Sequence, residues 1–183
     1  MIYSLSLHAA GVAVGLFLVL VGAVGLLNPG SVRTMARSLP RSRIAGIVLL
    51  TLALLWNLWL LATIEMGEFT SFRRPLLIAL PIGYLLILRF VDEFLAVRAL
   101  GILCLLVAEP LIDAAFLRYE MSRLLVTVFA YVLVIAGLFW VTMPYLLRDQ
   151  INWTTGSNTR WRLVNGAALI YGAVTLTIAM TQY

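Results

Sequence analysis

The sequence contains no lysine, and it has only one cysteine and one histidine in 183 residues. Without lysine, the chain cannot form a Schiff base or a lysine-dependent phosphate loop. The single Cys104 and the single His8 exclude an intrachain disulfide and a bis-histidine haem site. A zinc site needs more nitrogen and sulfur ligands than these residues supply. We therefore expect neither a metal nor a cofactor.

Charged residues are also scarce: they make up 11% of the chain, whereas hydrophobic residues make up 63%. An ordinary soluble domain has about 25% charged residues. Although the net charge is +5, charge this sparse cannot cover a water-exposed surface. The composition excludes a soluble enzyme, a disordered chain and a nucleic-acid-binding protein, and it predicts an integral membrane protein.

Apolar runs divide the chain into membrane spans of about 20 residues, the length that crosses about 30 Å of hydrocarbon. The run from Pro75 to Leu117 would be about 64 Å long as one helix, so we expect two spans joined by a turn at Arg89–Glu93. A re-entrant pair, which leaves five spans, is the alternative. The first run lacks a small-residue cleavage site, so we expect a retained span rather than a signal peptide. We predict an all-α bundle of six spans in one membrane domain, near residues 7–27, 44–64, 72–89, 94–117, 124–147 and 163–181.

Arginines are distributed unequally between the two ends of this predicted bundle. Because basic residues favour the cytoplasmic side, we expect both termini to lie outside the cytoplasm. The use of arginine at every basic position suggests a GC-rich bacterial genome, and hence a bacterial inner membrane. Nine arginines lie in the connections 1–2, 3–4 and 5–6, namely Arg33, Arg37, Arg41, Arg43, Arg89, Arg98, Arg148, Arg160 and Arg162, and four lie on the opposite side, namely Arg73, Arg74, Arg118 and Arg123.

The first and fifth spans share an ordered pattern at an offset of 115 residues. The pattern Gly–x6–Pro–x3–Arg occurs at Gly22–Arg33 and again at Gly137–Arg148. Five of 26 aligned positions are identical in this region. We interpret spans 1–2 and 5–6 as parallel repeats around a central hairpin; chance similarity between apolar sequences is the alternative.

Small residues form a stripe on the first span and another on the sixth. In lipid, helices associate where small residues let their backbones approach closely. The stripes predict an internal helix–helix interface, although a docking face for another subunit would have the same pattern. They contain Gly11, Gly15, Gly22 and Gly25 on the first span, and Ala168 and Gly172 on the sixth.

The arginine-rich connections predict contacts with lipid headgroups. Val32–Leu39 has the length of a short interfacial helix that ends at Pro40, and arginines on such a helix attract anionic headgroups. Binding of a nucleic acid or of a phosphorylated substrate is the alternative. The predicted headgroup contacts are Arg33, Arg37, Arg41, Arg43, Arg148, Arg160 and Arg162.

A candidate polar site lies in the outer third of the membrane. Glu109 and Asp113 share one face of the fourth span because they are i,i+4 neighbours, and Asn57 reaches a comparable depth on the second span. Pro81 and Pro110 each free a carbonyl group, so we expect helix breaks there. Buried ionisable groups are costly unless they are paired or hydrated. The site would hold an ion, a proton or a substrate; pairing with the outer arginines is the alternative.

No catalytic motif accompanies these residues, so we expect no enzymatic activity. The sequence favours an accessory or structural membrane protein that packs against lipids, other membrane subunits or further copies of itself. The alternative is a small secondary transporter or channel that uses Asn57, Glu109 and Asp113.

Overall fold

The computed structural model describes residues 5–90, 94–118 and 120–182, and every regular element in this part of the chain is helical. Residues 91–93, which include most of the predicted turn at Arg89–Glu93, lie outside the described residues. The order is α1 (Leu7–Leu27), α2 (Pro29–Ser38), η1 (Leu39–Arg41), α3 (Arg43–Thr63), η2 (Gly67–Phe72), α4 (Arg73–Phe90), α5 (Leu95–Ala115), α6 (Arg123–Thr142), α7 (Tyr145–Thr155) and α8 (Asn158–Gln182), where η denotes a short 3-10 helix.

Six of these helices, α1, α3, α4, α5, α6 and α8, are long and apolar enough to cross a membrane. The chain is therefore an all-α, integral membrane protein, as its composition predicts. The predicted end of the fifth span at residue 147 is wrong, because α6 ends at Thr142. Pro144 disfavours helical backbone in Met143, the residue before it, and the chain turns there. The sixth span begins at Asn158, earlier than predicted.

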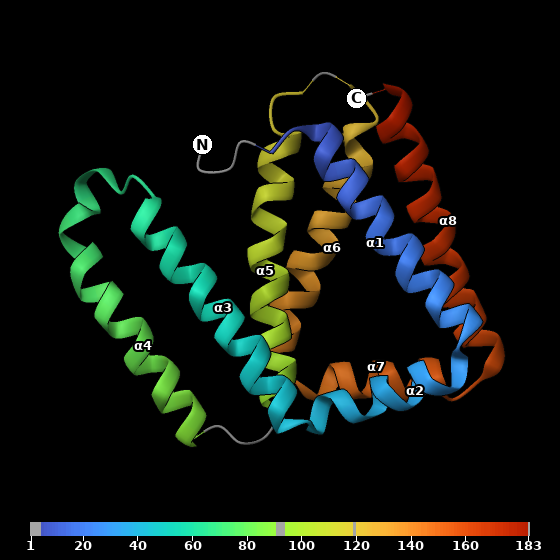
Figure 1. Cartoon of the computed structure of the whole chain (residues 1–183), viewed down its shortest axis with the longest axis horizontal. Coiled ribbons are helices and arrows are strands. Elements are labelled where there is room, and N and C mark those ends of the chain that lie inside the picture. The colour runs from blue at the N-terminus through green and yellow to red at the C-terminus, as the bar shows by residue number, and fades with distance from the viewer. Residues whose placement is uncertain (1–4, 91–93, 119, 183) are drawn as a thin grey trace.

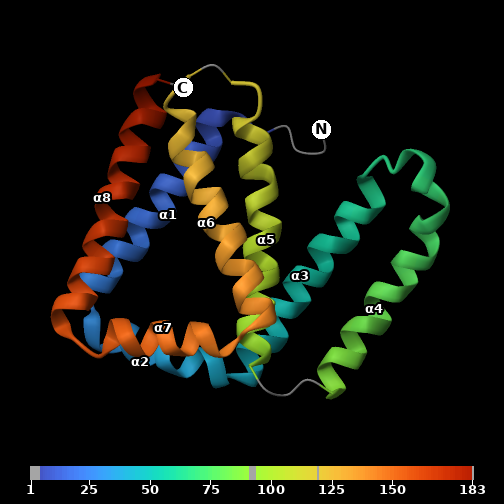
Figure 2. The same cartoon turned by 180° about the vertical axis from the view of Figure 1, so that it is seen from behind.

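Two short helices, α2 and α7, lie side by side across one end of the bundle (Figures 1 and 2). Pro29 occupies the start of α2, where a missing backbone N–H costs nothing because that group has no partner within the helix. The sequence predicts α2 within a few residues, but it gives no separate prediction for α7. We call the end of the bundle that carries these helices the basal end, and the opposite end the outer end.

The pair of α1 and α8 is held together by glycines. An added Cβ atom at Gly15 would lie 2.8 Å from the backbone nitrogen of Leu176, and one at Gly172 would lie 2.8 Å from that of Val19. Backbones this close leave no room for a side chain. The structure thus places the two predicted stripes of small residues against each other inside the molecule, with Gly11, Gly15, Gly22, Gly25 and Gly172 buried and Ala168 half-buried.

A second close pair, α5 and α6, forms the centre of the bundle. Gly101 and Gly137 face each other here, and an added Cβ at either would lie within 3.0 Å of the carbonyl oxygen of the other. Towards the outer end, α1 joins these helices in an apolar core that includes Val14, Leu111 and Val126. This core fixes α5 against the rest of the bundle.

The α3–α4 hairpin is attached to this body along only part of its length. Gly46, Leu50 and Ala53 are the buried residues of α3, and all lie in its basal half, against α5. In α4 no residue is buried. The hydroxyl groups of Thr51 and Tyr84 lie 2.8 Å apart and form a hydrogen bond that ties α4 to α3. From the basal contact, α3 and α5 diverge towards the outer end (Figure 1).

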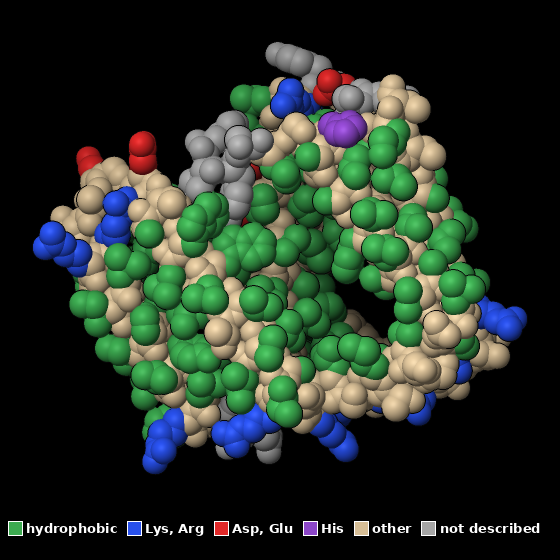
Figure 3. Space-filling view, in the orientation of Figure 1, with side chains coloured by type: hydrophobic (Ala, Val, Ile, Leu, Met, Phe, Trp, Pro, Cys, Tyr) green, Lys and Arg blue, Asp and Glu red, His purple; other side chains and the backbone are tan. Residues whose placement is uncertain are grey.

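The start of α1 and the end of α8 lie together at the outer end (Figure 1). A chain with an even number of membrane spans has its first and last helix ends on the same side of the membrane, and six spans therefore require this arrangement. Figure 3 shows arginines along the basal end and acidic side chains towards the outer end. The two ends of the bundle therefore differ in charge as the sequence predicts.

Candidate functional site

The divergence of α3 from α5 leaves a cleft of about 1110 Å³ near the outer end. Its walls come from the last turns of α3, from α5 and from one residue of α6. We call it the α3–α5 cleft. It is lined by Trp59, Thr63, Ile64, Glu65, Leu105, Ala108, Glu109, Ile112, Asp113, Phe116 and Val134.

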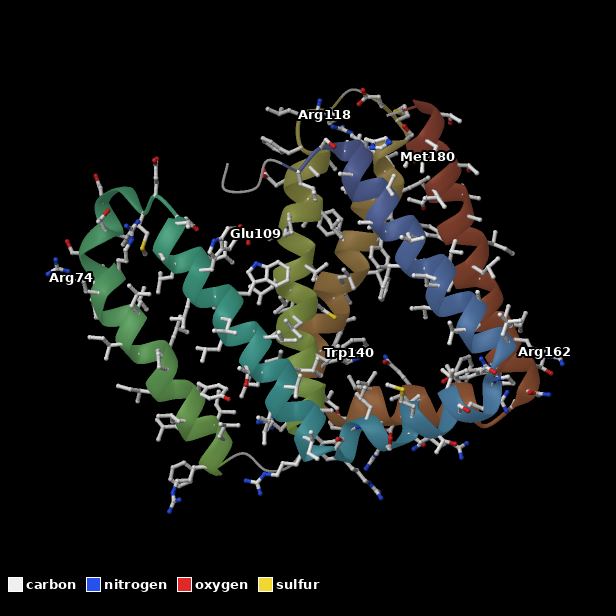
Figure 4. The ribbon with its side chains drawn as sticks, viewed as in Figure 1. Arg74, Glu109, Arg118, Trp140, Arg162 and Met180 are labelled. Carbon is white, nitrogen blue, oxygen red and sulfur yellow. The ribbon has the colours of Figure 1, made fainter. Side chains whose placement is uncertain are left out.

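Three carboxylates belong to this lining: Glu109, Asp113 and Glu65. Glu109 and Asp113 lie one turn apart on α5, and Figure 4 shows Glu109 projecting towards α3. Glu65 follows the end of α3 at the rim. None of the chain's arginines, all of which the structure describes, lines the cleft. The α3–α5 cleft therefore has three acidic side chains and no arginine in its lining, and the Arg73 guanidinium donates to the carbonyl oxygen of Ile64 at its rim.

The position of Glu109 makes this charge expensive. The residue lies six positions before Ala115, the last residue of α5, which places it about 9 Å below the outer end of the helix. Its side chain is exposed to whatever fills the cleft. An ionised carboxylate inside the membrane is unfavourable unless it is paired or hydrated. On insertion scales the cost is about 2.5 kcal/mol or more at the centre of a membrane helix. An occupant that supplies positive charge would remove this cost.

The acidic groups are not arranged as a metal site. In the described part of the chain, no three His, Cys, Asp or Glu side chains lie close enough together to hold a metal ion. The remaining wall of the cleft is mostly aliphatic and aromatic. This lining suits an apolar body that carries a positive group better than it suits a hydrated inorganic ion.

Asn57 does not join the two carboxylates of α5. Its Nδ2 atom donates to the carbonyl oxygen of Ala53 at 2.9 Å, one turn earlier on α3, and the residue is absent from the cleft lining. The sequence places these three residues at similar depth, but it does not determine which face of α3 turns towards α5.

The predicted helix breaks at Pro81 and Pro110 are wrong. Both prolines lie inside continuous helices, α4 and α5. A proline removes one ladder hydrogen bond and crowds the preceding turn, and membrane helices tolerate this because local adjustments satisfy the freed groups. The cleft therefore results from the divergence of two intact helices.

Two of the predicted headgroup arginines bind protein groups. The Arg33 guanidinium donates to Oδ1 of Asn158 at 2.6 Å and lies 5.0 Å from the ring centroid of Trp161. Arg37 donates to the Oγ1 and carbonyl oxygens of Thr155, at 2.9 and 3.2 Å. These contacts fasten α2 to the turn between α7 and α8.

The other predicted headgroup arginines lie at the basal end. Arg41, Arg43, Arg160 and Arg162 are exposed, and Figure 4 shows Arg162 at the start of α8. Arg148 forms an ion pair with Asp149 at 3.0 Å. Four exposed arginines give this end of the bundle a basic surface.

A second cavity, of about 310 Å³, lies between α1, α5 and α6. Its lining contains only apolar and aromatic side chains and Cys104, so it offers no polar group for recognition. His8 is exposed near the start of α1. Neither of the two lone reactive residues belongs to the α3–α5 cleft.

Sequence reasoning found Glu109 and Asp113 but missed the opposite wall of the cleft. Trp59 and Thr63 carry no signal that distinguishes them from other residues of an apolar span. Glu65 follows the predicted second span directly, and its position beside the outer end could have drawn attention to it.

Comparisons of the chain with protein-family models, curated proteins and solved structures return no match.

Proposed function

We propose that this integral membrane protein is a non-catalytic accessory subunit that binds a partner membrane protein in the α3–α5 cleft. The observation that carries the proposal is the combination of an open, largely apolar cleft with three carboxylates and no arginine in its lining. Such a cleft is unfavourable when lipid tails fill it, because hydrocarbon does not solvate a carboxylate. A partner that covers the cleft and brings a cation stabilises both chains.

The packing of the α3–α4 hairpin supports the same proposal. α4 buries no residue, and the outer half of α3 buries none. Helix association in membranes depends on close packing, and this hairpin has little of it within the chain. Binding of a partner at the α3–α5 cleft would give the outer half of α3 a packing surface on its inner side.

Site-specific photocrosslinking tests this proposal. A photoreactive phenylalanine analogue replaces Ile112, which lines the cleft, in the chain expressed in its native membrane. The control position is Leu85 on α4, whose side chain is 62% exposed and does not line the cleft. We expect a cross-linked protein of one defined mass from position 112 and lipid adducts alone from position 85. Lipid adducts alone from both positions would contradict the proposal.

A second candidate function, a small secondary transporter or channel, is supported by the depth of the two acids of α5. Carboxylates inside the membrane are typical of proton and ion pathways. In proteoliposomes of the purified protein, this function predicts a proton or cation flux that the Glu109→Gln variant loses. Absence of flux in the unaltered protein would contradict it and favour the accessory subunit.

We further propose that the protein lies in a bacterial inner membrane with both termini outside the cytoplasm. The nine arginines in the connections at the basal end, against four at the outer end, support this orientation. Alkaline phosphatase fused after α8 should be active, whereas a fusion between α2 and α3 should be inactive. The opposite pattern would reverse the orientation and leave the six-span fold unchanged.

A further inference from the structure

The α3–α5 cleft is a groove between two helices that has the length of a helical segment. The residues of α5 that line it begin at Leu105 and extend to Phe116, just past the end of the helix, and Trp59 and Thr63 of α3 lie opposite. This stretch of α5 extends about 16 Å. The groove therefore covers about half the thickness of the hydrocarbon core.

The volume of the cleft also suits a helix. At about 1110 Å³, it exceeds the roughly 300–1000 Å³ that is usual for pockets that bind small molecules. A helix about 10 Å across and about 15 Å long occupies roughly 1200 Å³. A transmembrane helix lying between α3 and α5 would fill the groove and pack against both.

The charge of the groove selects the kind of helix. Glu109 lines it about 9 Å, or a little under two turns, below the outer end of α5, and Asp113 lines it about half a turn from that end. No arginine lines it. A helix with an arginine or a lysine at the depth of Glu109 pairs with this carboxylate and reaches Asp113 one turn further out. A wholly apolar helix would cover both carboxylates without neutralising them, which is unfavourable because each ion loses its water.

A second copy of this chain does not supply that charge. On the six spanning helices, every arginine lies among the first five or the last two residues of its helix. Those at the outer end are Arg73, Arg74 and Arg123, each at the first or second position of its helix, and the Arg73 guanidinium is already bound to the carbonyl oxygen of Ile64 in its own chain. We therefore expect the complementary cation to come from a different chain.

We propose that the α3–α5 cleft binds one transmembrane helix of a partner protein, and that this helix carries an arginine or lysine about two turns from its outer end, opposite Glu109 and Asp113. This inference rests on the proposed accessory function and adds the chemistry of the partner segment. The same pairing fixes the depth at which the two helices meet.

Synthetic helices test the proposal without knowledge of the partner. Leucine–alanine peptides that span the membrane carry arginine, glutamine or leucine six residues from one end, and each bears a fluorescence acceptor. The donor is attached to the full chain at Glu68→Cys, an exposed residue, in a Cys104→Ala background. We expect energy transfer in proteoliposomes to show at least tenfold tighter binding of the arginine peptide than of the other two.

Two variants assign this preference to the cleft. The combined Glu109→Gln and Asp113→Asn variant should bind the three peptides equally, whereas Glu120→Gln, at an exposed acid outside the cleft, should keep the tenfold preference. Unfolding measurements on each variant establish that it is folded. Equal binding of the three peptides by the unaltered chain, or an unchanged preference after removal of both carboxylates, would overturn the proposal.

Two further outcomes would replace the proposal with another occupant. If none of the peptides binds, and tetraphenylphosphonium binds saturably in a way that depends on Glu109, the occupant is a small organic cation. Energy transfer between two labelled copies of the chain, with the cleft closed to all peptides, would indicate self-association. A cross-linked partner from position 112 that has no basic residue at this depth would overturn the inference and leave the proposed function in place.

Discussion

Replacement of Gly172 by alanine tests whether the close approach of α1 and α8 stabilises the protein. An added Cβ atom here would lie 2.8 Å from the backbone nitrogen of Val19 and 2.9 Å from the carbonyl oxygen of Gly15. Both are backbone atoms of α1, so no side-chain rotation can relieve the contact. The two helices must separate locally, by about 0.7 Å or more to reach ordinary contact distance.

The same helix provides a matched control. An added Cβ at Gly166 would meet no atom within 4 Å. Alanine is favoured over glycine in a helix by about 1 kcal/mol, and this gain applies to both substitutions. Overpacking of a close contact costs about 1–3 kcal/mol. We therefore expect the free energy of unfolding of Gly172→Ala to be about 1–3 kcal/mol lower than that of Gly166→Ala.

Unfolding in mixed micelles, followed by circular dichroism during titration with a denaturing detergent, measures this difference. Each variant is compared with the unaltered protein under the same lipid-to-detergent ratio. Equal stability of the two variants would show that the α1–α8 interface adapts without cost, and it would refute the argument that backbone proximity stabilises the pair.

Two further substitutions test the basal end of the bundle. Trp161 donates from Nε1 to the carbonyl oxygen of Gly25 at 2.7 Å in a buried position, so Trp161→Phe should lower the free energy of unfolding by about 1–3 kcal/mol. The control Trp153→Phe, at an exposed residue, should change it by less than about 0.5 kcal/mol. Equal losses from the two substitutions would contradict a specific hydrogen bond. For the bond from Arg37 to the Thr155 hydroxyl, a double-mutant cycle with Arg37→Ala and Thr155→Ala should give a coupling energy of about 0.5–2 kcal/mol. Additive effects would show that this hydroxyl contributes nothing to holding α2.

Residue type and hydrophobic run length were sufficient to predict the membrane spans. α1 extends over the predicted residues, and α3, α4 and α5 begin and end within two residues of them. A spanning helix must satisfy its backbone hydrogen bonds internally, and this local requirement leaves a clear signal in the sequence. Where a further local signal was overlooked, at Pro144, the prediction of the span was wrong.

The glycine pattern also carried information, although it did not identify the partners. The spacing of Gly15 and Gly22 marks one face of the first span, and Gly172 marks a face of the sixth. Close approach requires small residues on both helices, which the sequence shows. The pairing of Gly101 with Gly137 was not predicted, because each glycine stands alone on its helix face.

Six membrane spans, the positions of the arginines between them and the shared helix face of Glu109 and Asp113 could all be predicted from the sequence. These features depend on each residue's chemistry and on helical periodicity. The packing of α3 on α5 through its basal half alone, the bond of Asn57 to its own helix and the opening of a cleft beside the acids became visible in the folded chain. Rotation and tilt of a helix result from packing against its neighbours, which no single span encodes.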